Sequence, residues 1–114
     1  MIEISDCPDF TVNATGNYYT YGIYNYDGYD EDDDYYAAVR ILDSKVTVNA
    51  TDEYDYAYGI KAYEGSVVLG GSELDLTATG DYYAYGVYGY YGVYIFDCPK
   101  VSVTAESDYY AYGI

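Results

Sequence analysis

The chain has 114 residues, among them 22 tyrosines and 12 glycines, with neither tryptophan nor histidine. Lysine and arginine number 4 against 20 acidic residues, which gives a formal net charge of −16. Such a charge repels phosphate groups, so the composition argues against nucleic acid and anionic membrane surfaces as partners.

Short strands are predicted along the whole chain, because β-branched and aromatic residues alternate with polar ones and no helical periodicity is present. A closing strand at Ile2–Ser5 comes first, then an aliphatic strand at residues 10–15 and a tyrosine strand at 18–24. The same three kinds recur further along. Closing strands are expected at 38–42, 66–69 and 93–96, aliphatic strands at 46–51, 74–79 and 101–106, and tyrosine strands at 54–61, 82–88 and 109–114.

Each tyrosine strand contains Tyr-Ala-Tyr-Gly-Ile or a close variant of it. The glycines of the four copies are Gly22, Gly59, Gly86 and Gly113, and the last two intervals are each 27 residues. A repeat of this length with three strands is typical of one rung of a parallel β-solenoid, whose equivalent strands stack about 4.8 Å apart. We therefore expect an all-β chain, a parallel β-solenoid (β-helix) of about four rungs of three short strands each. Its ends are uncapped, and residues 1–114 form one domain.

Alternation predicts which face of each strand is buried. In the aliphatic strands the valine, leucine and alanine side chains are expected inside, and the threonine, asparagine and acidic side chains outside. In the tyrosine strands we expect the face that carries tyrosine and isoleucine or valine to lie inside, with the small alanine and glycine residues outside. The buried tyrosines would then stack along the axis as ladders formed by Tyr19, Tyr21, Tyr56, Tyr58, Tyr83 and Tyr85.

An acidic insertion at residues 24–37 lengthens the first repeat. Its oxygen-bearing side chains alternate around a glycine, and calcium takes six to eight oxygen ligands from a turning loop. The candidate ligands are Asn25, Asp27, Asp30, Asp32 and Asp34. The alternative is a solvated acidic loop, because the distal bidentate glutamate of an EF-hand loop is missing. No other cofactor is indicated.

Asn13 and Asn49 each begin an Asn-Ala-Thr sequence, the acceptor motif for N-glycosylation. Both are expected on the outer face of an aliphatic strand in adjacent rungs, where a glycan could be accommodated. The threonines and asparagines of this face also allow ice binding as a weaker alternative. Asp75, Ser102 and Glu106 interrupt that ladder.

The pattern V-x-V-x-A-x-x-x-Y-Y-A-Y-G-I resembles the repeats of bacterial surface proteins with a right-handed parallel β-helix of the pectate-lyase-like architecture. The resemblance covers nearly the whole chain and implies functions that range from polysaccharide lyase to adhesin. A lyase of this fold needs a basic residue as its Brønsted base, and only Arg40, Lys45, Lys61 and Lys100 are available. None lies in a convincing carboxylate cluster and no nucleophile motif is present, so we expect no enzyme.

The strand order suggests how copies of the chain could assemble. Counted from the first aliphatic strand, the final rung lacks a closing strand, while Ile2–Ser5 is a closing strand with no partners before it. Ile2–Ser5 of one copy could therefore complete the last rung of another, and a contact of this kind that does not close on itself makes an open filament. The residues expected at the assembly ends are Ile2, Ile4, Tyr110, Tyr112 and Ile114.

Cys7 and Cys98 both stand in Asp-Cys-Pro sequences that directly follow a closing strand. They are three rungs apart, about 14 Å, whereas a disulfide needs Cα atoms within about 7 Å. Between neighbouring copies they would be one rung apart, so an intermolecular Cys98–Cys7 disulfide is predicted. The alternative is two free thiols.

These features predict a structural subunit of an extracellular or cell-surface filament. No signal peptide is visible in the chain, and no apolar run is long enough for membrane insertion. The alternative is a fragment of a long bacterial surface adhesin or a carbohydrate-binding β-helix, with glycans as partners.

Overall fold

The computed structural model describes residues 1–27 and 37–114, and these residues form twelve strands. They are β1 (Ile2–Ser5), β2 (Phe10–Gly16), β3 (Tyr19–Asp27), β4 (Ala37–Leu42), β5 (Lys45–Asp52), β6 (Tyr56–Glu64), β7 (Ser66–Gly70), β8 (Glu73–Thr79), β9 (Tyr83–Gly89), β10 (Val93–Phe96), β11 (Lys100–Glu106) and β12 (Tyr110–Tyr112). Among these residues no helix is long and apolar enough to cross a membrane.

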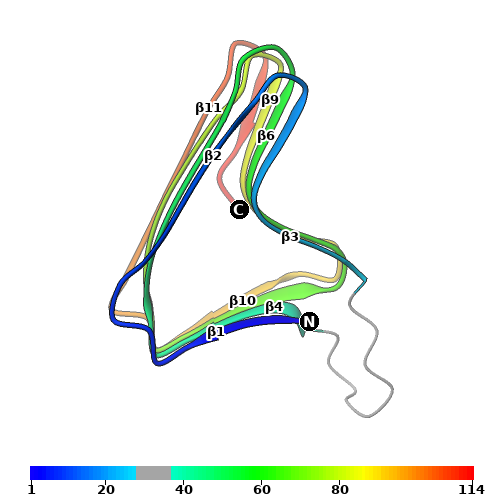
Figure 1. Ribbon diagram of the computed structural model, residues 1–114. Helices are drawn as coiled ribbons and strands as arrows, with labels where there is room; N and C mark the ends of the chain where they lie inside the picture. Colours follow the sequence, from blue (N-terminus) through cyan, green and yellow to red (C-terminus); the bar gives the residue numbers. More distant parts are fainter. Residues whose placement is uncertain (28–36) are drawn as a thin grey trace.

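The strands stack into three parallel sheets of four strands each, which confirms the predicted β-solenoid. The closing sheet has the order β1-β4-β7-β10, the aliphatic sheet β2-β5-β8-β11 and the tyrosine sheet β3-β6-β9-β12. Figure 1 looks along the stack, so that the sheets form the three sides of a triangle. Each rung runs closing, aliphatic, tyrosine, and the described strands make four complete rungs. Counted from β2, as in the sequence prediction, the same described strands end in β11 and β12 with no closing strand after them.

Equivalent residues of successive rungs lie side by side. Val48 pairs with Leu76, and Ala50 with Ala78, in the aliphatic sheet. These side chains are at most 1% exposed, as are the inward residues of the closing sheet such as Ile41. The predicted inner face of the aliphatic strands is therefore confirmed.

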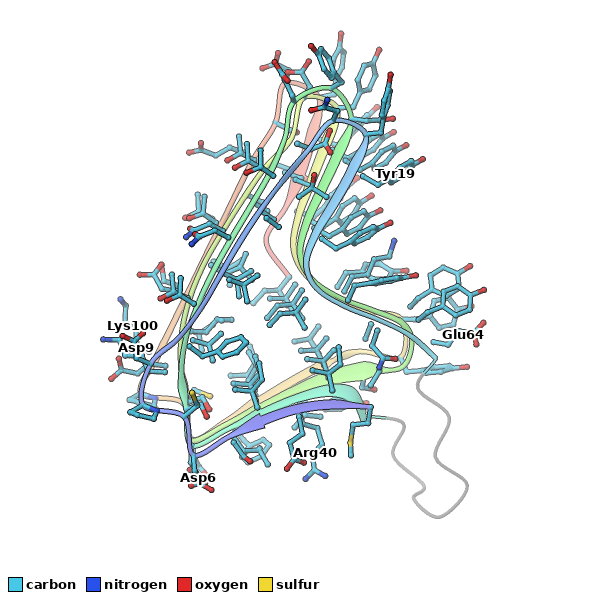
Figure 2. The ribbon with its side chains drawn as sticks, viewed as in Figure 1. Asp6, Asp9, Tyr19, Arg40, Glu64 and Lys100 are labelled. Carbon is cyan, nitrogen blue, oxygen red and sulfur yellow. The ribbon has the colours of Figure 1, made fainter. Side chains whose placement is uncertain are left out.

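The tyrosine strands bury the opposite face from the one expected. Ala57 and Ala84 are fully buried and belong to the core, whereas Tyr19 points away from the interior (Figure 2) and is 59% exposed. The reason is the narrow angle at which the aliphatic and tyrosine sheets converge toward the turn that joins them (Figure 1). A Cβ at Gly59 would already meet the side chain of Leu76 across that gap, so tyrosine rings do not fit there.

The alternation of the tyrosine strands changes phase at their glycines. In β6, Gly59 and Ile60 are both buried, although they are neighbours in sequence. The ladder to β9 runs through Tyr58 and resumes at Ile60, so the strand bends at the glycine. Beyond the bend the sheet diverges from the aliphatic sheet, which leaves room for a large aliphatic side chain. The expected burial of this isoleucine or valine position is confirmed. The expected inward placement of the tyrosines is wrong, although Tyr58, in the middle of the outer rings, is only 8% exposed.

Candidate functional site

Two ladders of stacked tyrosine rings cover the outside of the tyrosine sheet (Figure 2). Neighbouring ring centroids are 4.7 to 5.2 Å apart and their planes lie within 14° of each other. One ladder comprises Tyr19, Tyr56, Tyr83 and Tyr110, and the other Tyr21, Tyr58, Tyr85 and Tyr112. Such pairs contribute about 0.5–1.5 kcal/mol each beyond area burial. The predicted ladders are therefore present, but on the outer face.

Lys61 inserts its side chain among these rings. Its Nζ lies 3.8 Å from the centroid of Tyr58 and 5.4 Å from that of Tyr21. In the sheet register Lys61 stands between Tyr24 and Tyr88. Burial lowers the pKa of its ammonium, and burial followed by the neighbouring tyrosines raises the pKa of Tyr58. The outer tyrosine face therefore holds a cationic group of the protein itself, the Lys61 ammonium, against its ring faces.

The second rung turns from its aliphatic to its tyrosine strand around a buried carboxylate. Asp52 is 3% exposed, and its Oδ2 accepts a hydrogen bond from the Thr20 hydroxyl at 2.8 Å. Its Oδ1 accepts the backbone N–H groups of Tyr54 at 3.1 Å and Asp55 at 2.7 Å. Three donors compensate for the loss of water around the carboxylate and fix the shape of this turn.

The corner between the closing and aliphatic sheets is built in the same way in all four rungs. Its left-handed residue is Asp6 (φ 51), Asp43 (φ 46), Gly71 (φ 59) and Asp97 (φ 52) in turn. The residue that follows is Cys7, Ser44, Ser72 and Cys98. The two cysteines therefore occupy the outer rungs of a column whose inner members are serines.

Hydrogen bonds connect this column from rung to rung. The Cys7 N–H donates to the Ser44 hydroxyl at 3.0 Å, and the Ser44 N–H donates to the Ser72 hydroxyl at 3.1 Å. Both cysteines are free and partly buried. Each of the two serine side chains thus contacts the rung before it, and the thiols stand at the two ends of the stack.

The two end rungs leave apolar core positions uncovered. Ile41 and Leu69 are 0% exposed, whereas Ile95, which pairs with Leu69 in the last rung, is 42% exposed. In the last rung Tyr110 is 52%, Tyr112 48% and Ile114 63% exposed, and Ile2 and Ile4 of the first rung are only partly buried. The expected assembly ends are thus edges of the described sheets, with incomplete burial at both.

The glycines of the tyrosine sheet show the same difference between interior and edge. A Cβ at Gly22 would lie 2.6 Å from the carbonyl oxygen of Gly59, and one at Gly59 would lie 2.7 Å from that of Gly86. Gly86 is packed against Gly113 in the same manner, but a Cβ at Gly113 would meet nothing within 4 Å. The close packing thus stops at the last rung.

The two candidate glycosylation sites lie side by side on the outer face of the aliphatic sheet, as expected. Asn13 pairs with Asn49 in the register, and the Asn49 side-chain amide donates a hydrogen bond of 2.8 Å to the Asn13 side-chain oxygen. A glycan on Asn49 would replace one of the hydrogens of that amide. Asn13 is the more exposed of the two.

Most of the predicted calcium ligands cannot be placed. Asp30, Asp32 and Asp34 lie outside the described residues, and of Asp27 only its position at the end of β3 is described. Asn25 pairs with Ala62, which faces the core, and its Oδ1 is buried without a hydrogen-bond partner in the described chain. The described residues contain no group of three or more side chains suited to a metal ion.

Two features escaped the sequence reasoning. Ser44 and Ser72 continue the cysteine column, and the second turn holds one residue more than its neighbours, namely Asp55. The sequence contains a signal for each feature. Aligning the repeats at the left-handed corners places Ser44 and Ser72 in the same column as the cysteines. Counting the residues between paired strand positions shows that the second turn is one residue longer.

No family model, no curated protein and no solved structure matches the chain. The likeness to bacterial β-helix surface proteins consequently rests on the strand pattern alone.

Proposed function

We propose that this protein is a structural unit of an extracellular or cell-surface filament, in which copies stack end to end and continue the solenoid. The edge formed by β10, β11 and β12 of one copy would pair with the edge formed by β1, β2 and β3 of the next. Ile2–Ser5 would lie beside β10, so a whole rung is added rather than one missing strand. Sheet edges pair readily in this way because their backbone donors and acceptors are unsatisfied.

The observation that carries the proposal is the equivalence of the two end rungs. Both have the left-handed corner, at Asp6 and Asp97, that the inner rungs have. Both expose aliphatic positions whose inner counterparts are buried. A copy placed one rung spacing beyond the last rung would therefore meet the same contacts that join the inner rungs, and the tyrosine ladders would continue across the junction.

The cysteines support the same arrangement. Cys98 of one copy and Cys7 of the next would occupy adjacent positions of the corner column, about 4.8 Å apart by the rung spacing. Disulfides join Cα atoms about 4.4–6.8 Å apart. A disulfide at this position would link neighbouring copies in an oxidising compartment, which agrees with an extracellular location.

Two single variants test the junction. Cys7→Ser retains only Cys98, and Cys98→Ser retains only Cys7, so neither can form the head-to-tail disulfide with itself. Mixed under mild oxidation, the two variants should give one covalent dimer on non-reducing electrophoresis. Peptide mapping should find Cys98 joined to Cys7, while the wild-type protein gives a ladder of multimers.

Dimers that form equally well in each variant alone would contradict the proposal, because they would show random thiol contact. A wild-type protein that remains monomeric when concentrated and oxidised would contradict it as well. The double variant Cys7→Ser/Cys98→Ser serves as the control. It should still associate without covalent links, because the edges supply the pairing.

A second candidate is a longer surface adhesin or carbohydrate-binding β-helix, in which further rungs of the same chain cover these edges. The same incomplete burial at the edges is compatible with it. Electron microscopy distinguishes the two candidates. An adhesin segment of 114 residues would aggregate irregularly, whereas a filament subunit would form filaments of uniform width.

A further inference from the structure

The extra residue of the second turn breaks one column of tyrosines. Between paired strand positions, the turns of the first, third and fourth rungs hold two residues, and the second holds three, with Asp55 added. At the tip of these turns stand Tyr18, Tyr54, Tyr82 and Tyr109. The ring centroids of Tyr18 and Tyr54 are 6.5 Å apart, and those of Tyr82 and Tyr109 are 4.5 Å apart. No ring contact joins Tyr54 to Tyr82 among those that the structure describes.

A groove of about 430 Å³ lies at this interruption. Its walls are Tyr54 and Tyr82 at the turn and the first tyrosine ladder, represented by Tyr19, Tyr56 and Tyr83, with Asp55 between them. Tyr54 and Tyr82 are 55% and 49% exposed. Tyr54 has its ring neighbour, Tyr18, in the first rung, and Tyr82 stacks on Tyr109 in the last. Tyr82 also contacts Tyr83, at 6.5 Å between ring centroids, and that ring is itself a wall of the groove. The exposed ring surfaces of Tyr54 and Tyr82 that face each other across the groove are therefore available to a ligand.

The charge of the groove selects the kind of ligand. Asp55 uses its backbone N–H and carbonyl oxygen to build the turn, and its carboxylate makes no hydrogen bond or ion pair within the described chain. None of the basic side chains lines the groove. The pKa of Tyr56 is raised by burial, then by Tyr83 and Asp55, so the phenol stays neutral and the Asp55 carboxylate is the charged group among the residues that line the groove. Aromatic faces beside a carboxylate favour a cation.

The protein itself shows that this face accepts such a group. Lys61 places its ammonium 3.8 Å from the centroid of Tyr58, and the Tyr58 ring is 6.4 Å from that of Tyr56, which borders the groove. We propose that the groove between Tyr54 and Tyr82 binds an organic cation, an alkylammonium or guanidinium group, between its ring faces and the Asp55 carboxylate. The cation can come from a free amine or guanidine or from a lysine or arginine side chain of a polypeptide.

The site can be tested by titration followed through the ring resonances of isotope-labelled tyrosine at constant ionic strength. The probes are butylguanidinium, the peptide acetyl-Gly-Arg-Gly-amide, and the same peptide with neutral citrulline in place of arginine. One saturable site is expected for the cationic probes, with the citrulline peptide weaker by about fivefold or more. Equal affinity for the free cation and the peptide would indicate recognition of the cation alone, and a tighter peptide would indicate a polypeptide ligand. Both outcomes support the site.

Variants separate this groove from general attraction to an acidic protein. Tyr82→Leu and Asp55→Asn should each weaken binding about fivefold, and deletion of Asp55 should abolish saturable binding because it restores the regular turn. Tyr90→Leu, which removes a still more exposed ring outside the groove, should leave the affinity unchanged. Binding that is unaffected by the Asp55 deletion, or equal for arginine and citrulline, would overturn the proposal. Unfolding curves of the Asp55→Asn variant establish that the fold is retained.

Discussion

Replacing Gly59 by alanine tests the packing that places the tyrosines outside. The new Cβ would lie 2.7 Å from the carbonyl oxygen of Gly86 and would also meet the side chain of Leu76. The leucine can rotate, but the carbonyl is held in the sheet, so the strand must move. Overpacking of this kind costs about 1–3 kcal/mol, partly offset by about 0.4–1 kcal/mol from the less flexible unfolded chain.

Gly113→Ala is the matched control, because a Cβ there meets nothing within 4 Å. Thermal unfolding of the monomer should show a Tm lower by roughly 5 °C for Gly59→Ala, from the middle of these two ranges at about 4 °C per kcal/mol, and nearly unchanged for Gly113→Ala. A Gly59→Ala protein as stable as the wild type would refute the inward placement of the glycines. Gly113→Ala should nevertheless prevent end-to-end assembly, because the carbonyl oxygen of Gly22 in the next copy would lie where the new methyl group is.

Three further outcomes are expected. Because the pKa of Tyr58 is raised in the folded state by burial and its neighbours, the stability that its neutral phenol contributes is complete below about pH 10. It falls by about 1.4 kcal/mol per pH unit above that value, and Tyr58→Phe should reduce this slope in denaturant titrations. Asp52→Ala should lower the free energy of unfolding by about 2 kcal/mol, because it leaves buried hydrogen-bond donors without an acceptor. Asp81 is exposed in the next turn, so Asp81→Ala should change the free energy of unfolding by about 0.5 kcal/mol or less. Added salt should speed assembly in light scattering by screening the −16 charge, and a slower rate would contradict this.

The solenoid and its aliphatic face could be predicted because local pattern and tertiary packing agree there. Val48, Leu76 and Val103 alternate with polar residues, and such a strand has one plausible buried face. Their repetition at equal spacing then determines the register. The strand limits were less certain, since β3 and β6 continue three residues beyond the expected ends, to Asp27 and Glu64.

The buried face of the tyrosine strands could not be predicted with the same security. Tyrosine is amphipathic, and the isoleucine or valine of each repeat shares its alternation with the rings until the bend at the glycine reverses the phase. Which face fits depends on the angle between two sheets, a tertiary property that no single strand encodes. Glycine and alanine at alternate positions were nevertheless a usable signal, because glycine within a strand often marks close approach of another backbone.

The groove and the corner column depend on differences between repeats rather than on the repeat itself. Asp55 adds one residue to one turn, and Cys7 and Cys98 replace serine only at the two ends of a column. Such differences become meaningful once the register is known, because only then can each rung be compared with the next at the same position in space.

Electron cryomicroscopy of the assembled protein tests end-to-end stacking most directly. End-to-end stacking should give filaments in which the strand spacing of about 4.8 Å continues without interruption through the junction, with a subunit repeat of about 19 Å for four rungs. β1 should lie beside β10 of the neighbouring copy, with density joining Cys7 to Cys98. Copies joined side by side through their tyrosine faces, with the end rungs still open to solvent, would contradict it.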